Sequence, residues 1–215
     1  MDAEKSGITR KTLLKAAIIA VPAGVLLSGQ GPALAREVAR AGALLTPTPY
    51  CDDDDDDTTP AQTEGPYFKS DSPRRTVLPG DGVPLTVTGY VLGRLGGPIS
   101  GALLDFWQAD AEGAYDNAGY DLRGHQFSDA RGAFRLTTVV PGLYPGRTRH
   151  LHVKVQAPNG PVLTTQLYFP GEPGNDTDNI FHTELLMKVR DVGAAKEATF
   201  DFVLEVDGPR PASRT

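Results

Sequence analysis

The chain has 215 residues, of which 40% are hydrophobic and 22% are charged, and its formal net charge is −6. These values indicate one globular domain with extensions, and they exclude a fibrous or fully disordered polymer. The acidic balance argues against a nucleic-acid partner, and the single cysteine excludes an intramolecular disulfide.

Residues 1–35 are similar to an export signal. Arg10, Lys11 and Lys15 precede an apolar run that ends at Leu27, and the segment closes on "ALA", the small-x-small pattern that a signal peptidase cleaves. The stretch "TRKTLLK" is similar to a twin-arginine signal, with Lys11 in place of the second arginine. We therefore expect export out of the cytoplasm by the twin-arginine route, and no stable membrane association after cleavage. An uncleaved anchor is the alternative, although the apolar run is shorter than the ~20 residues that span a bilayer.

Residues 36–57 are expected to form a flexible acidic linker. Six consecutive aspartates, from Asp52 to Asp57, repel one another too strongly for a compact element. A calcium site is the sharper alternative, but calcium loops place turn residues between their ligands. The roles of this run and of Cys51 beside it are left open.

Residues 58–215 carry the pattern of an all-β domain. From Leu85 onward, apolar residues recur with period two, and β-branched and aromatic residues are concentrated in the same segments. Gly- and Pro-rich connectors separate these segments and block helices. The expected fold is an antiparallel β-sandwich with long loops. The expected strands are 85–92, 102–108, 133–139, 150–156, 163–169 and 198–206.

The segment "HLHVKV" places two histidines one residue apart. In an extended strand, side chains at i and i+2 point to the same face, so His150 and His152 project together. Leu151 and Val153 face the opposite way. The chain has four histidines, and half of them lie here. The pattern predicts a two-imidazole clamp for a metal ion, although such pairs also occur by chance on protein surfaces.

Two tyrosines are candidates to complete this clamp. Tyr144 lies six residues before His150 on a Pro- and Gly-rich loop that could fold it back toward the strand, and Tyr115 follows the strand 102–108. Tyrosine binds metals as the phenolate, and with an ordinary pKa of about 10 it needs a hard, strongly charged cation such as ferric iron. Two phenolates and two imidazoles would reduce the charge of Fe³⁺ to about +1, which leaves room for an anionic substrate. An ordinary half-buried aromatic is the alternative for each tyrosine.

Four segments together carry a resemblance to a known family. They are "TPAQTEGPYF", "GALLDFWQADAEGAYD", "LRGHQFSDARGAFRLTTVVPGLYPGRTRHLHVKV" and "LTTQLYFPGE", in this order. They resemble the intradiol ring-cleaving dioxygenases, a family that includes catechol 1,2-dioxygenases, hydroxyquinol dioxygenases and protocatechuate 3,4-dioxygenases. The resemblance covers roughly Thr58 to Val206, and a chance β-sandwich would not reproduce all four segments.

The resemblance implies a non-haem ferric iron, Fe(3+), as cofactor, held by two tyrosines and two histidines. The matching positions are Tyr115 after "AEGA", Tyr144 in "LYPGR", and His150 and His152 in "RHLH". The residues and the resemblance therefore point to the same four ligands. The resemblance also implies that Tyr144 leaves the metal when substrate binds and then acts as general base, which would make it a catalytic residue as well.

The resemblance further implies a substrate pocket. Arg147, three positions before the first histidine, would stabilise anionic intermediates, and Gln166 in "TTQLYF" resembles the family's pocket glutamine. Gly65 and Pro66 of "TEGPYF" are expected to line the cavity. Arg149 alternates to the opposite face from His150, so we expect a surface charge there rather than a catalytic one.

The expected activity is cleavage of a catechol-type ring between its two hydroxyl-bearing carbons with O2, to give a muconate-type dicarboxylate. The expected partners are a small aromatic diol and O2. Pocket shape decides among catechol, protocatechuate, hydroxyquinol and lignin-derived diols, so the sequence leaves the substrate open, and it leaves open whether the chain forms a homo-oligomer. Two alternatives belong to other classes: a secreted β-sandwich binding module without a catalytic metal, and a zinc or copper protein that uses His150 and His152.

Overall fold

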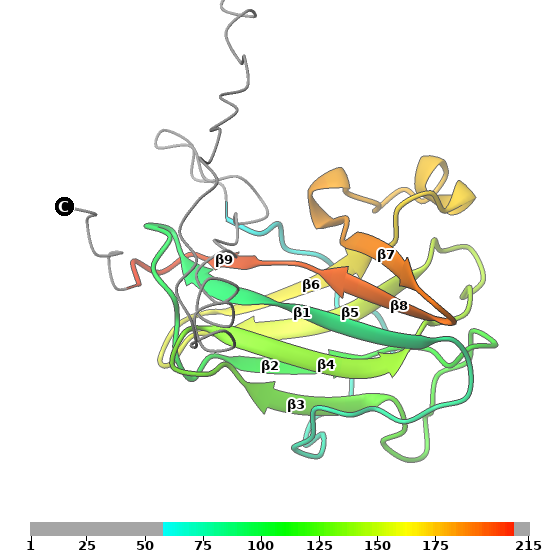
Figure 1. The fold of residues 1–215 in the computed structure, drawn as a ribbon, viewed down its shortest axis with the longest axis horizontal. Helices are drawn as coiled ribbons and strands as arrows, with labels where there is room; N and C mark the ends of the chain where they lie inside the picture. Colours follow the sequence, from blue (N-terminus) through cyan, green and yellow to red (C-terminus); the bar gives the residue numbers. More distant parts are fainter. Residues whose placement is uncertain (1–57, 209–215) are drawn as a thin grey trace, which may run out of the picture. The chain divides into compact units, whose positions relative to one another are not determined.

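The computed structural model describes residues 58–208 (Figure 1). The predicted export signal, residues 1–35, and the predicted acidic linker, residues 36–57, lie outside the described residues, as do residues 209–215. Within residues 58–208, no helix has the length and apolar character needed to cross a membrane.

The described residues form strands joined by loops, as the Gly- and Pro-rich connectors predict. Two short 3-10 helices, η1 (Pro173–Asp176) and η2 (Thr183–Leu185), lie between the sixth and seventh strands. The strands are β1 (Pro84–Gly93), β2 (Leu103–Trp107), β3 (Arg123–Phe127), β4 (Ala133–Val139), β5 (His150–Gln156), β6 (Val162–Tyr168), β7 (Lys188–Val192), β8 (Ala195–Thr199) and β9 (Phe202–Leu204).

The strands form two sheets, which confirms the predicted all-β sandwich (Figure 1). The larger sheet has the order β4-β1-β8-β7, with β9 also paired to β1, and the smaller sheet has the order β3-β2-β5-β6. Every pairing in the smaller sheet is antiparallel. In the larger sheet, β1 pairs with β8 and β9 in parallel, so the sandwich is not purely antiparallel as the sequence pattern predicts.

β8 and β9 follow one another in the chain, and they pair in parallel with successive parts of β1. The chain leaves the sheet between Thr199 and Phe202, so the predicted strand 198–206 is interrupted. At the interruption the backbone of Phe200 passes over Gly89, where a Cβ atom would lie 1.7 Å from the Phe200 carbonyl oxygen. Only glycine permits this approach. The β7–β8 hairpin returns the chain in the direction of β1, which makes the contact parallel.

The hydrophobic core takes side chains from both sheets. In β5, Leu151, Val153 and Val155 are at most 1% exposed, and they join Val87 of β1 and Leu136 of β4 in one cluster of buried residues. Full burial of a side chain of this size contributes roughly 2 kcal/mol to folding. Because alternate residues of β5 fill the core, its remaining side chains lie on the outer face of the smaller sheet.

Two observed strands, β3 and β7, were not among the expected ones. In β3, "RGHQF", the residues on the core side are Gly124 and Gln126, so apolar alternation is missing. In β7, "KVRDV", only Val189 packs against the core, and the strand lies at the edge of its sheet. Pairing with neighbouring strands, which a pattern of single residues does not show, places both segments in the sheets.

Candidate metal centre

The outer face of the smaller sheet carries the predicted histidines. His150 and His152 lie on this face of β5 and are only 4% and 3% exposed. Across the sheet, His150 pairs with Tyr168 of β6, and His152 pairs with Gln166 of β6 and with Trp107 of β2. The shared face that the His-x-His spacing predicts is therefore present, and polar and aromatic side chains surround it.

The segment 58–75 covers this face. The histidines on the face are therefore buried, although they lie outside the hydrophobic core. The backbone N–H of Gln62 donates to the Thr164 carbonyl at 2.8 Å, and the Gln166 side-chain amide donates to the Thr63 carbonyl at 2.9 Å. Gly65 follows with φ of 70°, a conformation that favours glycine, and a Cβ atom there would lie 3.6 Å from Cε1 of His152. The predicted pocket residue Gly65 thus lies against a predicted ligand.

The two imidazoles direct nitrogen atoms toward each other. Nδ1 of His150 donates to the Thr148 carbonyl at 2.6 Å, so its Nε2 carries the lone pair. The Nε2 atoms of His150 and His152 are 3.1 Å apart, and the ring of His152 stacks on Trp107 with centroids 4.7 Å apart. Two nitrogens that bind one ion at right angles, each at about 2.1 Å, lie about 3 Å apart. The pair is spaced as ligands of one ion would be.

Burial keeps both imidazoles neutral. Burial lowers the pKa of His150 to about 4, and the hydrogen bond to Thr148 opposes this only in part. Burial, with the neighbouring His150 and Arg147, lowers the pKa of His152 well below its ordinary value. Neutral imidazole is the form that binds metals, so this environment prepares both rings as ligands.

Tyr115 approaches the histidines from one loop, and Tyr144 lies beside Tyr115 on another. The hydroxyl of Tyr115 lies 3.4 Å from Nε2 of His150, and the ring centroids of the two tyrosines are 5.9 Å apart. Burial raises the pKa of Tyr115 to about 12, although Arg147 and Arg123 act to lower it. A phenolate at this position therefore needs a nearby cation at neutral pH. Two imidazoles and two phenols, which together could bind one cation, therefore lie in the same region.

Tyr67 is a further residue of the site, and it was not predicted. Its hydroxyl lies 2.9 Å from that of Tyr144, and its ring stacks on Tyr115 with centroids 4.3 Å apart and planes at 10°. The hydrogen bond with Tyr144, together with burial, raises the pKa of Tyr67. Tyr67 belongs to "TEGPYF", the segment that supplied Gly65 and Pro66, so its position beside them was the available signal.

Arg147 reaches the same face through the loop that carries Tyr144. Its Nε donates to Oδ2 of Asp178 at 2.8 Å, and its Nη2 donates to Oε1 of Gln166 at 2.6 Å and to the Tyr168 hydroxyl at 3.3 Å. The predicted substrate-binding residues Arg147 and Gln166 are therefore in direct contact. Nη1 makes no hydrogen bond within residues 58–208, which leaves it available to a ligand.

Asp178, also not predicted, fixes this arginine. Its side chain is 4% exposed, and Oδ2 also accepts the backbone N–H of Thr148 at 2.9 Å. Burial acts to raise the pKa of Asp178, but the hydrogen bonds from Thr148, Arg147 and Ile180 outweigh it, so the pKa lies below its ordinary value. The carboxylate is thus ionised at neutral pH and balances the guanidinium.

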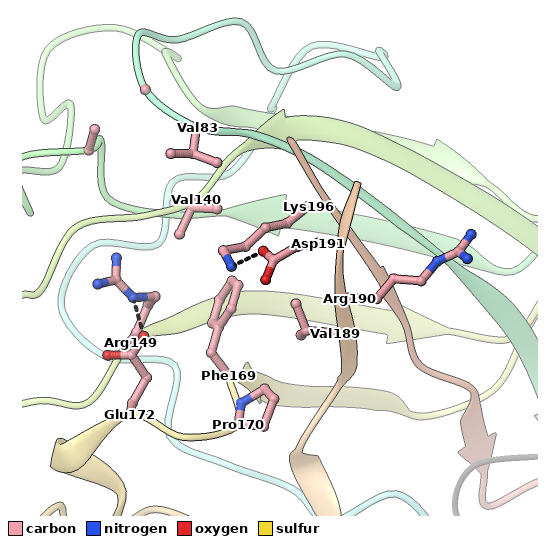
Figure 2. A pocket seen from close by; sticks show the side chains of 12 residues that line it. Val83, Val140, Arg149, Phe169, Pro170, Glu172, Val189, Arg190, Asp191 and Lys196 are labelled. Carbon is pink, nitrogen blue, oxygen red and sulfur yellow. Dashed lines mark hydrogen bonds and ion pairs between the residues drawn. The ribbon is translucent and has the colours of Figure 1, made fainter. Parts of the chain in front are cut away.

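Arg149 points away from the histidines, as the alternation predicts. It forms an ion pair with Glu172 at 2.7 Å and lines a separate cavity of about 520 Å³ with Val140, Phe169 and Lys196 (Figure 2). It is a half-buried charge that is paired with Glu172. No predicted ligand lines this cavity.

The geometry assembles most of the predicted residues. The two tyrosines, the two histidines, Arg147, Gln166 and Gly65 meet on the outer face of the smaller sheet, whereas Pro66 is exposed. Within residues 58–208, no group of three His, Cys, Asp or Glu side chains could hold a metal ion. A metal at this position therefore needs the phenols as ligands, and the donor set fits a hard trivalent ion better than zinc.

Comparisons with known proteins agree with this geometry. A family model described as "Dioxygenase" matches residues 60–206. The chain is 29% identical over 172 residues to chlorocatechol 1,2-dioxygenase from Pseudomonas sp. strain P51, a match that covers 66% of this chain and 68% of that protein. It is 36% identical over 115 residues to the protocatechuate 3,4-dioxygenase beta chain of Burkholderia cepacia, covering 45% of this chain and 49%, about half, of that protein.

A solved structure resembles the chain more closely in sequence. It is the dioxygenase domain of a dioxygenase carbohydrate-binding protein fusion from the cellulolytic bacterium Streptomyces sp. SirexAA-E. The two share 65% identity and a TM-score of 0.69, over 70% of this chain and 99% of that chain.

Proposed function

Because the chain belongs to the intradiol dioxygenase family, we propose that it is a non-haem Fe³⁺ dioxygenase. Its reaction would cleave a catechol-type ring between the two hydroxyl-bearing carbons with O2 and release a muconate-type dicarboxylate. The observation that carries this proposal is the meeting of Tyr115, Tyr144, His150 and His152 on one covered face, with the histidine nitrogens 3.1 Å apart.

These four residues would hold the iron. When bound, ferric iron would withdraw electron density from a coordinated catecholate and so make its ring reactive toward O2. The neutral imidazoles and the two phenolates would leave about one positive charge on the site, which favours a dianionic diol over a neutral phenol. The covering segment 58–75 would limit the access of water to the face.

Tyr144 would move the substrate proton. As a free phenolate, its oxygen would accept a proton from a bound diol and so become a hydroxyl. Tyr67, 2.9 Å from the same oxygen, would hold the Tyr144 ring in place in both states. The hydrogen bond between the two hydroxyls gives this proton a defined position.

Arg147 would stabilise negative charge that develops on the substrate. Asp178 and Gln166 hold two of its nitrogens, at 2.8 and 2.6 Å, so Nη1 is directed by a fixed guanidinium plane. A preorganised donor of this kind contributes roughly 3 kcal/mol to a transition state. The substrate class is a small aromatic diol, and O2 is the second reactant.

We also propose that the protein acts outside the cytoplasm, and the support for this lies in the N-terminal sequence. The twin-arginine-like segment 1–35 supports export, and a chain that must bind iron in the cytoplasm before transport is suited to that route. N-terminal sequencing of protein recovered outside the cytoplasm tests this proposal, because a processed chain would begin near residue 36. An intact N-terminus in the cytoplasm would contradict it.

The first test of the function is a visible spectrum of the purified, iron-loaded protein before and after catechol is added in air. We expect a phenolate-to-iron band that shifts when catechol binds and decays as the ultraviolet absorption of a muconate-type product grows. A protein that stays colourless with added ferric iron would contradict the proposal and favour the binding module. Metal analysis that finds only zinc or copper would favour the zinc or copper protein that uses His150 and His152.

Replacing Tyr67 with phenylalanine should slow turnover roughly 10-fold, because outer groups that fix a ligand typically contribute that much to activity. The stacked ring is retained and only the hydroxyl that contacts Tyr144 is lost. The steady-state kcat with catechol measures the effect. Tyr120→Phe is the matched control, since it removes a hydroxyl that donates to the Ser70 carbonyl at 3.0 Å in a neighbouring loop. Equal losses in both variants would exclude a specific role for Tyr67.

A further inference from the structure

Arg123 is a buried cation close to the candidate centre that the proposed chemistry does not use. It begins β3, pairs across the sheet with Trp107, and is 1% exposed. Within residues 58–208, no carboxylate lies within ion-pair distance of its guanidinium. A buried guanidinium without an anion is costly unless its N–H groups are well bonded. The hydrogen bonds that offset this cost indicate the role of Arg123.

The guanidinium of Arg123 joins two backbone segments. Nη1 donates to the Tyr67 carbonyl at 2.5 Å, while Nη2 and Nε donate to the Asp116 carbonyl at 2.9 and 3.3 Å. Asp116 directly follows Tyr115. One planar group thus holds the carbonyls of Tyr67 and of Asp116, the neighbour of Tyr115. The rings of Tyr67 and Tyr115 stack with centroids 4.3 Å apart.

The stacked pair connects to the rest of the site at both ends. The Tyr115 hydroxyl lies 3.4 Å from Nε2 of His150, and the Tyr67 hydroxyl lies 2.9 Å from that of Tyr144. A shift of either segment would move both phenols relative to the histidines. Arg123 bonds both segments to β3, a strand of the sheet on which the histidines lie.

We propose that Arg123 is a positioning residue that sets the Tyr67 and Tyr115 rings in register with the histidine pair. The rigid, planar fork of arginine is required, because two carbonyls from different segments must be bonded by one group. Lysine carries the same charge but lacks this fork. This role deepens the proposed function and rests on it only for the readouts that involve iron and turnover.

The chain offers a matched control in Arg75. Its Nε donates to the Arg123 carbonyl at 2.9 Å and its Nη2 donates to the Tyr120 carbonyl. Arg75 therefore also joins two backbone carbonyls of the same region, but it makes no hydrogen bond to the peptides of Tyr67 or Asp116. A variant of Arg75 separates general loss of stability from loss of tyrosine positioning.

The experiment compares wild type, Arg123→Met, Arg123→Lys and Arg75→Met. We expect Arg123→Met to weaken ferric-ion binding and to lower kcat by roughly 10- to 100-fold each, with a shifted phenolate-to-iron band and little change in KM. Arg123→Lys should recover only part of this loss. Arg75→Met should keep the band position and kcat even where its melting temperature falls.

Two readouts need no iron. In metal-free protein, near-ultraviolet circular dichroism should change in the tyrosine region for Arg123→Met and not for Arg75→Met. With Arg123→Ala, added methylguanidinium should restore part of the wild-type spectrum. A tyrosine spectrum and band position unchanged in Arg123→Met and Arg123→Ala, or the same changes in Arg75→Met, would overturn the proposal. If wild type fails to cleave catechol, the proposed function fails, and the metal-free spectra still decide the role of Arg123.

Discussion

His152→Ala should bind no ferric iron and should lose more than about 100-fold in ring cleavage, because the loss of a ligand exceeds the effect of an outer residue. His152 supplies one of two nitrogens that lie 3.1 Å apart and stacks on Trp107. Iron content and the visible band of the purified variant measure the effect directly.

His125→Ala is the control for this variant. His125 lies on the outer face of the same sheet, in β3, and its Nδ1 contacts the Ser72 carbonyl at 2.7 Å. It should retain iron and most of its turnover. A His152→Ala protein that keeps both iron and activity would show that the histidine pair is not the metal site.

Arg147→Ala should retain iron yet lose roughly 100- to 1000-fold in kcat, the range found when one preorganised donor is removed from developing negative charge. The reason is geometric, since Nη1 is directed by a guanidinium that Asp178 and Gln166 hold on its other nitrogens. The phenolate-to-iron band should stay close to that of wild type, and the kcat for catechol should carry the loss.

Asp178→Asn tests how the arginine is held. Removing one partner of a buried ion pair typically costs about 3 kcal/mol, so the melting temperature should fall together with kcat. Arg149→Ala breaks a similar pair with Glu172 on the other side of the strand, and it should lower stability without a comparable loss of kcat. Turnover that survives Arg147→Ala would refute the assigned role.

The sequence predicts the parts of this protein that depend on local alternation. Period-two segments locate six of the strand regions, and the spacing of His150 and His152 places both on one face. The position of Arg149 away from that face follows from the same rule. These features depend only on the geometry of one strand, so the sequence of that strand is enough to predict them.

Residues that act through distant contacts could not be predicted in this way. Tyr67 meets Tyr144 across 77 residues, and Asp178 meets Arg147 across 31. The strand β3 lacks apolar alternation and is defined by its partner β2. The parallel course of β8 and β9 depends on how the chain returns along β1. Each of these outcomes is decided by the folded chain rather than by a local pattern.

The covering segment 58–75 has a consequence for folding kinetics. The hydrogen bond between Thr63 and Gln166 spans 103 residues, whereas β5 and β6 pair through a short hairpin. Contacts with large sequence separation form late, because their loop-closure entropy must first be overcome. We therefore expect the β5–β6 hairpin, which carries both histidines, to form before the covering segment reaches it, and ferric colour in a refolding experiment to develop later than that hairpin.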